Sequence, residues 1–218
     1  LTLTSTSGVS NSATATVTVL DTIAPTVLTQ NITVYLDANG NASIVAADVD
    51  NGSSDNCAIA SMSVAPNTFT CADSNANTVT LTVTDVSGNT SSATATVTVL
   101  DNIAPTVLTQ NITVYLDANG NASIVPADAD NGSTDNCAIA SYSVSPNIFT
   151  CADSNANSVT LTVTDVSGNV NTATATVTVL DTFAPSVVTQ NITVYLDANG
   201  NANIVGSDVN NGSTDNCA

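Results

Sequence analysis

The sequence is a tandem repeat. The segment "LDTIAPTVLTQNITVYLDANGNAS" begins at Leu20, returns with one change from Leu100, and returns with four changes from Leu180. Positions 21–100 and 101–180 differ at only 11 of 80 places, so one module has been copied in tandem. A fixed period of this length is the signature of an array in which each copy folds as one supersecondary unit.

The period divides the chain into four parts. Residues 21–100 and 101–180 are complete repeats, residues 1–20 match the C-terminal strands of a preceding repeat, and residues 181–218 match the N-terminal half of a further one. Because two fragments flank two full copies and the chain lacks an initiator Met, we expect a segment of a longer array.

Within each repeat, apolar residues alternate with polar ones. Val79, Leu81 and Val83 are separated by threonines, and 93–99 follow the same pattern. This period of two predicts strands with one face in a core and the other in water. Gly-, Asn- and Pro-containing turns separate the strands, and no stretch has helical periodicity. The expected fold is all-β, with antiparallel β-sandwiches in an extended array and one further strand within 66–76.

Charge excludes several classes of function. The chain has no Lys, Arg or His, and its 18 acidic residues are all aspartates, for a net charge of −18. Nothing can neutralise phosphate, so nucleic acids and anionic membrane surfaces are not expected partners. No apolar run is long enough to span a membrane. An enzyme is not expected either, because general acid–base catalysis would rest on Asp, Tyr or Cys alone.

The cysteines also follow the repeat. Each full copy holds two cysteines 14 positions apart. An even number per copy predicts disulfides Cys57–Cys71 and Cys137–Cys151, and with them an oxidising compartment. Such a bridge would stabilise a repeat by about 3 kcal/mol in the chain-entropy model. A metal site is the alternative, but two thiols without His are a poor zinc site.

Aspartates crowd into one loop of each repeat. "DVDNGSSDN" (48–56) supplies several side-chain oxygens around a glycine, the donor set that Ca²⁺ prefers. In the third copy Asn210 replaces one aspartate, which we expect to weaken that site. The alternative is a solvated loop whose short polar side chains form turns. The candidate ligands in the three copies are Asp48, Asp50, Asp55 and Asn56; Asp128, Asp130, Asp135 and Asn136; and Asp208 and Asp215.

Two further motifs add candidate ligands. The turn "DVSGN" carries Asp85 and Asp165, although an aspartate that caps its own hairpin turn is the simpler interpretation. In an immunoglobulin-like strand order this turn would share a pole with the 48–56 loop and with the linker aspartates Asp21, Asp101 and Asp181. Calcium would then lie at the junctions between repeats. The first fragment has Ser5 where the later copies have Asp85 and Asp165.

"D..AP", "DNC" and "VTLTVTDVSGN…ATATVTV", in this order, resemble the hyalin-repeat (HYR) type of immunoglobulin-like domain, which is related in architecture to fibronectin type III modules. The resemblance covers each repeat unit. It implies tandem modules in large secreted or surface-anchored proteins, with roles in adhesion and extracellular architecture. Members commonly carry a Cys-Pro near the first strand and a buried Trp. This chain has Thr29, Gln30 and Asn31 at the first place and no Trp.

Two functions follow from these features. The first is a structural stalk or filament of a surface protein, rigidified by calcium and disulfides, whose partners are neighbouring repeats and other copies in a fibre. The second is an adhesion module that binds a glycan or a protein, which aromatic platforms would favour, yet aromatics are 3% of the chain. The threonine arrays also suggest an ice-binding surface. Near-identical copies favour the stalk, because a spacer needs only length.

Overall fold

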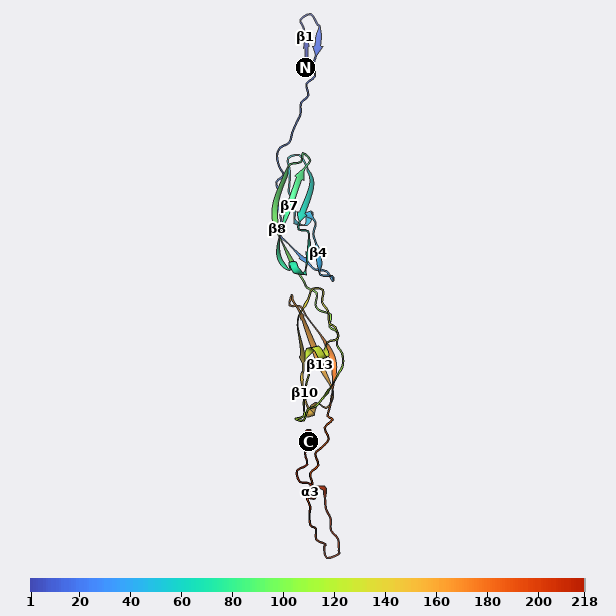
Figure 1. The fold of residues 1–218 in the computed structure, drawn as a ribbon. Helices are drawn as coiled ribbons and strands as arrows, with labels where there is room; N and C mark the ends of the chain where they lie inside the picture. The colour runs from blue at the N-terminus through green and yellow to red at the C-terminus, as the bar shows by residue number, and fades with distance from the viewer. Residues whose placement is uncertain (218) are drawn as a thin grey trace. The chain divides into compact units, whose positions relative to one another are not determined.

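The computed structural model describes residues 1–217, which fold as two compact units, Leu1–Asp101 and Asn102–Ala218. Each unit contains one complete sandwich (Figure 1). In the first, a four-stranded sheet has the order β3-β8-β7-β5, and a two-stranded sheet consists of β4 and β6. The bounds are β3 Ile32–Tyr35, β4 Asn41–Ser43, α1 Ala46–Val49, β5 Ile59–Ala65, β6 Thr68–Thr70, the 3₁₀ helix η1 Cys71–Asp73, β7 Asn75–Asp85 and β8 Thr90–Leu100.

The second sandwich has the same elements one period later in the sequence. Its large sheet has the order β11-β13-β14-β9, and β10 pairs with β12. The bounds are β9 Ile112–Tyr115, β10 Asn121–Ser123, α2 Pro126–Ala129, β11 Ile139–Ser145, β12 Ile148–Thr150, η2 Cys151–Asp153, β13 Asn155–Asp165 and β14 Val170–Leu180. The all-β fold class is therefore confirmed. None of the described helices is long and apolar enough to cross a membrane.

The longest hairpin forms the inner wall of each core. β7 and β8 pair without interruption from Asn75↔Val99 to Thr84↔Thr90. Their alternating valines and Leu81 are buried, Ala95 is buried and Ala93 half-buried, and the threonines between them are half-buried or exposed, as the period-two pattern predicts. In the second repeat, side chains of β13 and β14 form one cluster with residues of β11, β12, α2 and the connecting segments: Leu116, Ile124, Ala129, Val144, Phe149, Val159, Ala175, Val177 and Val179.

One pairing differs from the antiparallel expectation. β3 runs parallel to β8, with Ile32 opposite Val97, and β9 runs parallel to β14. These are the first and last strands of the large sheet in each repeat. Because they point the same way, the chain enters a repeat at one end and leaves it at the other.

The segment 66–76 contains the further strand that the sequence predicts. Pro66 follows a cis peptide bond, β6 occupies Thr68–Thr70, and η1 precedes the start of β7 at Asn75, whose φ is 84°. β6 places Phe69 in the core with 2% of its surface exposed. Its short length and irregular flanks explain why no alternating pattern marks it.

The two fragments show which elements need a distant partner. β1 (Thr2–Thr4) and β2 (Ser10–Ser12) pair in the same register as the end of the β7–β8 hairpin, because the turn between them is local. Residues 13–20 match residues 93–100 of β8 but form no strand, and neither do 192–195, which match β3. The one-turn helix α3 (Gly206–Val209) does form, since its hydrogen bonds are local.

Candidate metal site

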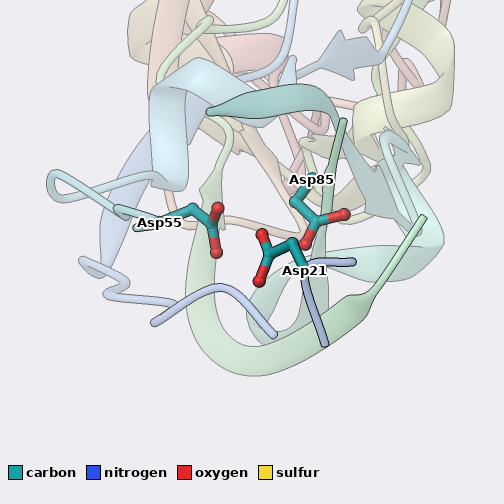
Figure 2. A group of neighbouring side chains, drawn as sticks. All are labelled: Asp21, Asp55 and Asp85. Atoms are coloured by element: carbon teal, nitrogen blue, oxygen red, sulfur yellow. The ribbon is translucent and has the colours of Figure 1, made fainter. Parts of the chain in front are cut away.

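Three carboxylates converge at the end of the first sandwich where the chain enters. Asp21, Asp55 and Asp85 each present an oxygen, and these oxygens lie within 4.8 Å of one another (Figure 2). Asp21 belongs to the linker, Asp55 to the loop before β5, and Asp85 is the last residue of β7. The pairing of Ile59 with Asp85 brings that loop to the end of β7.

Asp85 is held by its own turn. Its Oδ1 accepts the backbone N–H groups of Ser87 (2.8 Å) and Asn89 (2.8 Å), and its Oδ2 accepts the Asn89 side-chain amide (2.7 Å). Only 1% of Asp85 is exposed. Burial by itself would raise the pKa of Asp85, but the hydrogen bonds from Asn89, Ser87 and Gly88 outweigh it and the pKa is lowered. Asp85 is therefore a carboxylate at neutral pH.

Two N–H donors hold the linker aspartate in place. Asp21 Oδ1 accepts the backbone N–H of Ile23 (3.1 Å) and the side-chain amide of Asn56 (3.2 Å). These hydrogen bonds, the one from Ile23 first, lower the pKa of Asp21. The Asn89 amide also donates to the carbonyl oxygen of Asp21 (3.2 Å), so the hairpin turn holds the linker in place. Asp55 Oδ2 accepts the backbone N–H of Cys57 (2.9 Å).

The other oxygens of this group have no donor. Asp21 Oδ2 and Asp55 Oδ1 are both buried from solvent without a hydrogen-bond partner. A charged acceptor that is hidden from water and left unsatisfied is destabilising, and a cation is the usual remedy. No Lys, Arg or His exists in the chain to supply one. The residues therefore fit a bound metal ion.

The donor chemistry selects among metals. Three aspartates give a hard, all-oxygen, triply negative set, which suits Ca²⁺. Cys57 lies next to the group, but its hydrogen bond with Asp21 raises the pKa of the thiol. The neutral thiol is a poor ligand for the soft metals that bind thiolate. The side-chain amide of Asn56 donates a hydrogen bond to Asp21 Oδ1, so Asn56 positions the carboxylate.

The loop 48–56 does not gather its own three aspartates. Asp48 Oδ2 accepts the N–H of Val45 (2.7 Å) and caps α1. Asp50 accepts the N–H groups of Gly52 (3.2 Å) and Ser53 (3.1 Å) and closes a turn. Each is occupied by backbone donors, because short acidic side chains fold back on their own loop. Of the three, only Asp55 reaches the group in Figure 2.

The later copies repeat these local roles. Asp128 and Asp208 cap α2 and α3 through the N–H groups of Val125 and Val205, and Asp130 closes the turn at Gly132 and Ser133. Asn210 accepts the N–H of Ser213 (3.0 Å) just as Asp130 accepts that of Ser133. The amide therefore replaces the carboxylate without loss of the turn, and this position lies outside the three-carboxylate group.

Asp101, Asp135 and Asp165 occupy the equivalent positions in the second repeat. Asp165 is 2% exposed and accepts the N–H groups of Ser167 and Asn169, and Asp135 Oδ1 is buried without a donor. In the third copy Asp181 Oδ1 accepts from Phe183 and Asn216, and Asp215 Oδ1 is buried without a donor. Asn136, the equivalent of Asn56, directly precedes Cys137.

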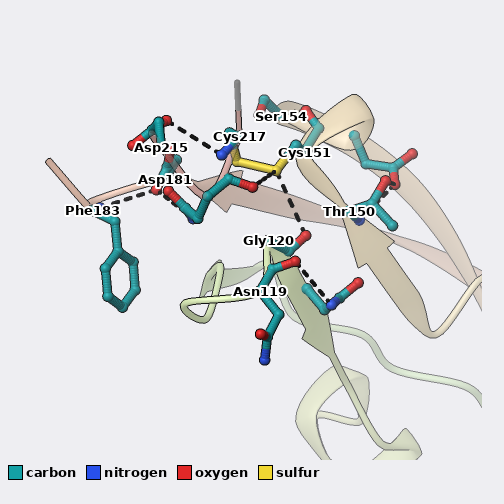
Figure 3. Close-up of a disulfide and its surroundings, with 12 residues drawn as sticks. Asn119, Gly120, Thr150, Cys151, Ser154, Asp181, Phe183, Asp215 and Cys217 are labelled. Atoms are coloured by element: carbon teal, nitrogen blue, oxygen red, sulfur yellow. Dashed lines mark hydrogen bonds between the residues drawn. A yellow bond between two sulfur atoms is a disulfide. The ribbon is translucent and has the colours of Figure 1, made fainter. Parts of the chain in front are cut away.

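The predicted disulfides within repeats are wrong. Cys57 is a free thiol, and Cys151 is bonded to Cys217, with the Cα atoms 5.3 Å apart (Figure 3). Cys71 and Cys137 are disulfide-bonded as well. Cys57 precedes β5 at the Asp85 end of β7, whereas Cys71 precedes the other end at Asn75. Eleven strand residues span about 36 Å, far beyond the roughly 6 Å that a disulfide allows.

Comparisons with known proteins give fold-level likeness only. No family model matches the sequence, and no curated protein matches it. Among solved structures, cadherin domains 1–4 of protocadherin gamma B7 are 12% identical over 78% of this chain and 54% of that one, with a TM-score of 0.35. EC1-2 of human mucin-like protocadherin is 15% identical over 72% of this chain and 98% of that one, with a TM-score of 0.36. Titin domains I67–I69 are 12% identical over 75% of this chain and 70% of that one, with a TM-score of 0.30.

Proposed function

We propose that the protein is a stalk or filament segment of a secreted or surface-anchored protein of the hyalin-repeat type, whose repeats are stiffened by calcium. The ion is held by the linker aspartate, the loop aspartate and the hairpin aspartate of each repeat: Asp21, Asp55 and Asp85 in the first. The repeats act as spacers that hold an adhesive part of the parent protein away from a cell.

The two buried oxygens without donors, Asp21 Oδ2 and Asp55 Oδ1, carry this proposal. Without a cation they face a third buried carboxylate at close range, and repulsion would push the linker away from the repeat. Calcium replaces that repulsion with coordination. Because Asp21 belongs to the linker and the other two ligands belong to the sandwich, the ion restricts bending where the chain enters the repeat.

Two further observations support the stalk. The parallel first and last strands make the chain leave each repeat at the end opposite its start, which suits a linear array. The disulfide Cys151–Cys217 is typical of an oxidising, extracellular setting, where Ca²⁺ is abundant enough to fill weak sites. We propose that neighbouring repeats of the same chain are the main partners of each repeat, and that the chain has no catalytic role.

Calorimetric titration and thermal melting of the whole chain test the metal site. With a dissociation constant near 10⁻⁴ M, 10 mM Ca²⁺ would stabilise a repeat by about 2.7 kcal/mol, which raises Tm by roughly 10 °C. Mg²⁺ should give a smaller shift, because it demands tighter octahedral geometry. Small-angle scattering with Ca²⁺ should show a longer particle than with EDTA. A titration without heat and melts that ignore both ions would refute the calcium part of the proposal.

A further inference from the structure

The disulfide Cys151–Cys217 joins two different repeats. Cys151 begins η2 in the copy 101–180, and Cys217 lies in the copy that starts at 181, 66 residues further on. Both half-cystines pack against the hydrophobic core of the second sandwich. The disulfide is therefore part of a packed junction between the two repeats.

The residues around the bridge form a docking contact between the two copies. Asn216 donates from its side-chain amide to the carbonyl oxygen of Asp117 (3.1 Å) in the earlier repeat and to Asp181 Oδ1 (3.2 Å) in the linker. The backbone oxygen of Asn216 lies 3.3 Å from Cys151 Sγ. Gly120 lies directly beneath this contact (Figure 3), where a side chain would meet both Cys151 Sγ and Asn216 O.

Each residue of the "DNC" motif thus has a separate role at the junction. Asp215 is the equivalent of Asp55 in the three-carboxylate group, Asn216 braces the linker against the earlier repeat, and Cys217 makes the covalent bond. The motif stands at 55–57, 135–137 and 215–217. The sequence period therefore extends the pairing to Cys71 and Cys137, which stand exactly one period before Cys151 and Cys217. No cysteine precedes Cys57 in this chain, and Cys57 is free.

We propose that the array is a covalent ladder, in which a disulfide ties each repeat to the next and makes the stalk almost inextensible. This deepens the stalk function proposed above but does not depend on calcium. Force passing along the chain would cross from Cys71 to Cys137, follow the backbone to Cys151, and cross to Cys217. The segments enclosed between bonded cysteines carry none of the load once each bridge is taut.

The bridges greatly reduce the length to which an unfolded repeat can be extended. An unfolded repeat of about 80 residues without bridges can extend to about 280 Å, at about 3.5 Å per residue. With a bridge at each end, the load-bearing segment of about 14 residues can extend only to about 50 Å, close to the roughly 36 Å length of the strand β13. Unfolding a repeat under tension therefore adds only about 14 Å, against more than about 200 Å for a repeat without bridges. A stalk with these bridges lengthens little even when its domains unfold.

Each bridge forms when two thiols lose two protons and two electrons. An exported dithiol–disulfide oxidoreductase accepts them by thiol–disulfide exchange, so its disulfide is reduced as the new one forms. The oxidising compartment inferred above provides such partners. Docking of Asn216 on the earlier repeat would bring the correct cysteine pair together for this exchange.

Peptide mapping of the whole chain tests the connectivity. After blocking of free thiols, a protease that cleaves before aspartate releases 55–72, 135–152 and 215–218, because no aspartate lies within 58–70 or 138–150. The ladder predicts one covalent species made of these three peptides, with Cys57 alone alkylated. Separate, internally bridged 55–72 and 135–152 peptides would overturn the proposal.

Single-molecule pulling from both ends of the chain tests the mechanics. A Cys57→Ser background removes the free thiol, and the handles are attached by peptide tags. Two bridges limit full extension to about 310 Å, against about 760 Å after reduction. Adding Cys217→Ser leaves one bridge and should give about 535 Å without reductant. EDTA should leave all three limits unchanged. If the Cys57→Ser chain extends to about 760 Å without reductant, the proposal is overturned. If it extends to about 535 Å, only one bridge is present and the repetition of the bridge along the array is overturned.

Discussion

Gly120 lies so close to Cys151 that a Cβ atom on the glycine would stand 2.6 Å from the Cys151 sulfur and 2.8 Å from the backbone oxygen of Asn216. Gly120 also has a φ of +74°, the left-handed region that glycine adopts without strain. The absence of a side chain at this position is what allows the next copy to dock.

Gly120→Ala should therefore disturb the junction more than an ordinary turn substitution. The control is Gly132→Ala, which meets the same conformational penalty at φ +85° but has open space around its Cα. We expect Gly120→Ala to cost about 1–3 kcal/mol more, as overpacking does, and to leave free thiols at Cys151 and Cys217. Urea unfolding and thiol counting measure the two effects. Equal behaviour of the two variants would mean that the contact does not hold the junction.

The chain itself supplies matched variants for the metal site. Ser5 stands where later copies have aspartate, and its turn keeps the same backbone bonds, Ser5 N to Val9 O (2.8 Å) and Gly8 N to Ser5 O (2.9 Å). Asp85→Ser with Asp165→Ser should thus preserve the hairpin while removing a ligand. Asn210 shows in the same way that Asp50→Asn keeps its turn.

We expect the double variant Asp85→Ser/Asp165→Ser to lose most of the roughly 10 °C rise in Tm that calcium gives. The control Asp50→Asn/Asp130→Asn should keep it, because those carboxylates lie outside the three-carboxylate group. Differential scanning calorimetry in Ca²⁺ and in EDTA measures both. Loss of the calcium effect in the control alone would assign the ion to the 48–56 loop.

Acid should destabilise the calcium-free protein through its turn aspartates. Backbone N–H groups of Asn41 and then Asn39 lower the pKa of Asp37 below its ordinary value of 3.8, and Asn121 and Asn119 do the same for Asp117. The unfolded chain binds protons more readily at these carboxylates than the folded chain does. Their contribution to folding stability is therefore present above about pH 4 and is lost as the pH falls through their folded-state pKa.

The variant Asp37→Asn/Asp117→Asn should therefore be less stable than the parent at pH 7 but lose less stability between pH 5 and pH 2.5. Urea midpoints in EDTA across this range measure the difference. A parent and a variant with parallel pH curves would show that these carboxylates do not couple folding to protons.

Exchanging valine and threonine should affect stability differently on the two faces of β7. Val83 is fully buried, and Thr82 beside it is half-buried on the opposite face. Val83→Thr places a hydroxyl in the core and should cost about 1–3 kcal/mol, whereas Thr82→Val should change stability by less than about 0.5 kcal/mol. Urea unfolding of the whole chain measures both. Similar losses would contradict the assigned orientation of the strand.

The amino-acid sequence by itself determined the repeat, the all-β class and the buried face of the long hairpin. Regular spacing in the sequence reveals these features. One segment recurs at Leu20, Leu100 and Leu180, and apolar residues alternate with threonines between Val79 and Val83. It also indicated the turns, because Gly and Asp at fixed offsets favour them regardless of the rest of the chain. The parallel pairing of β3 with β8 has no such local signal, since the two strands lie at opposite ends of the repeat in sequence.

Only the tertiary structure decided which side chains meet. Cys57 and Cys71 are close in the sequence, yet β7 separates them by its whole length, and Cys151 instead meets a cysteine 66 residues away. Asp48 and Asp50 are neighbours of Asp55, but backbone donors occupy them, while Asp21 and Asp85 reach Asp55 from distant segments. The physical reason is the same in both cases. An extended strand carries sequence neighbours to opposite ends of a domain, and strand pairing brings distant segments to the same end.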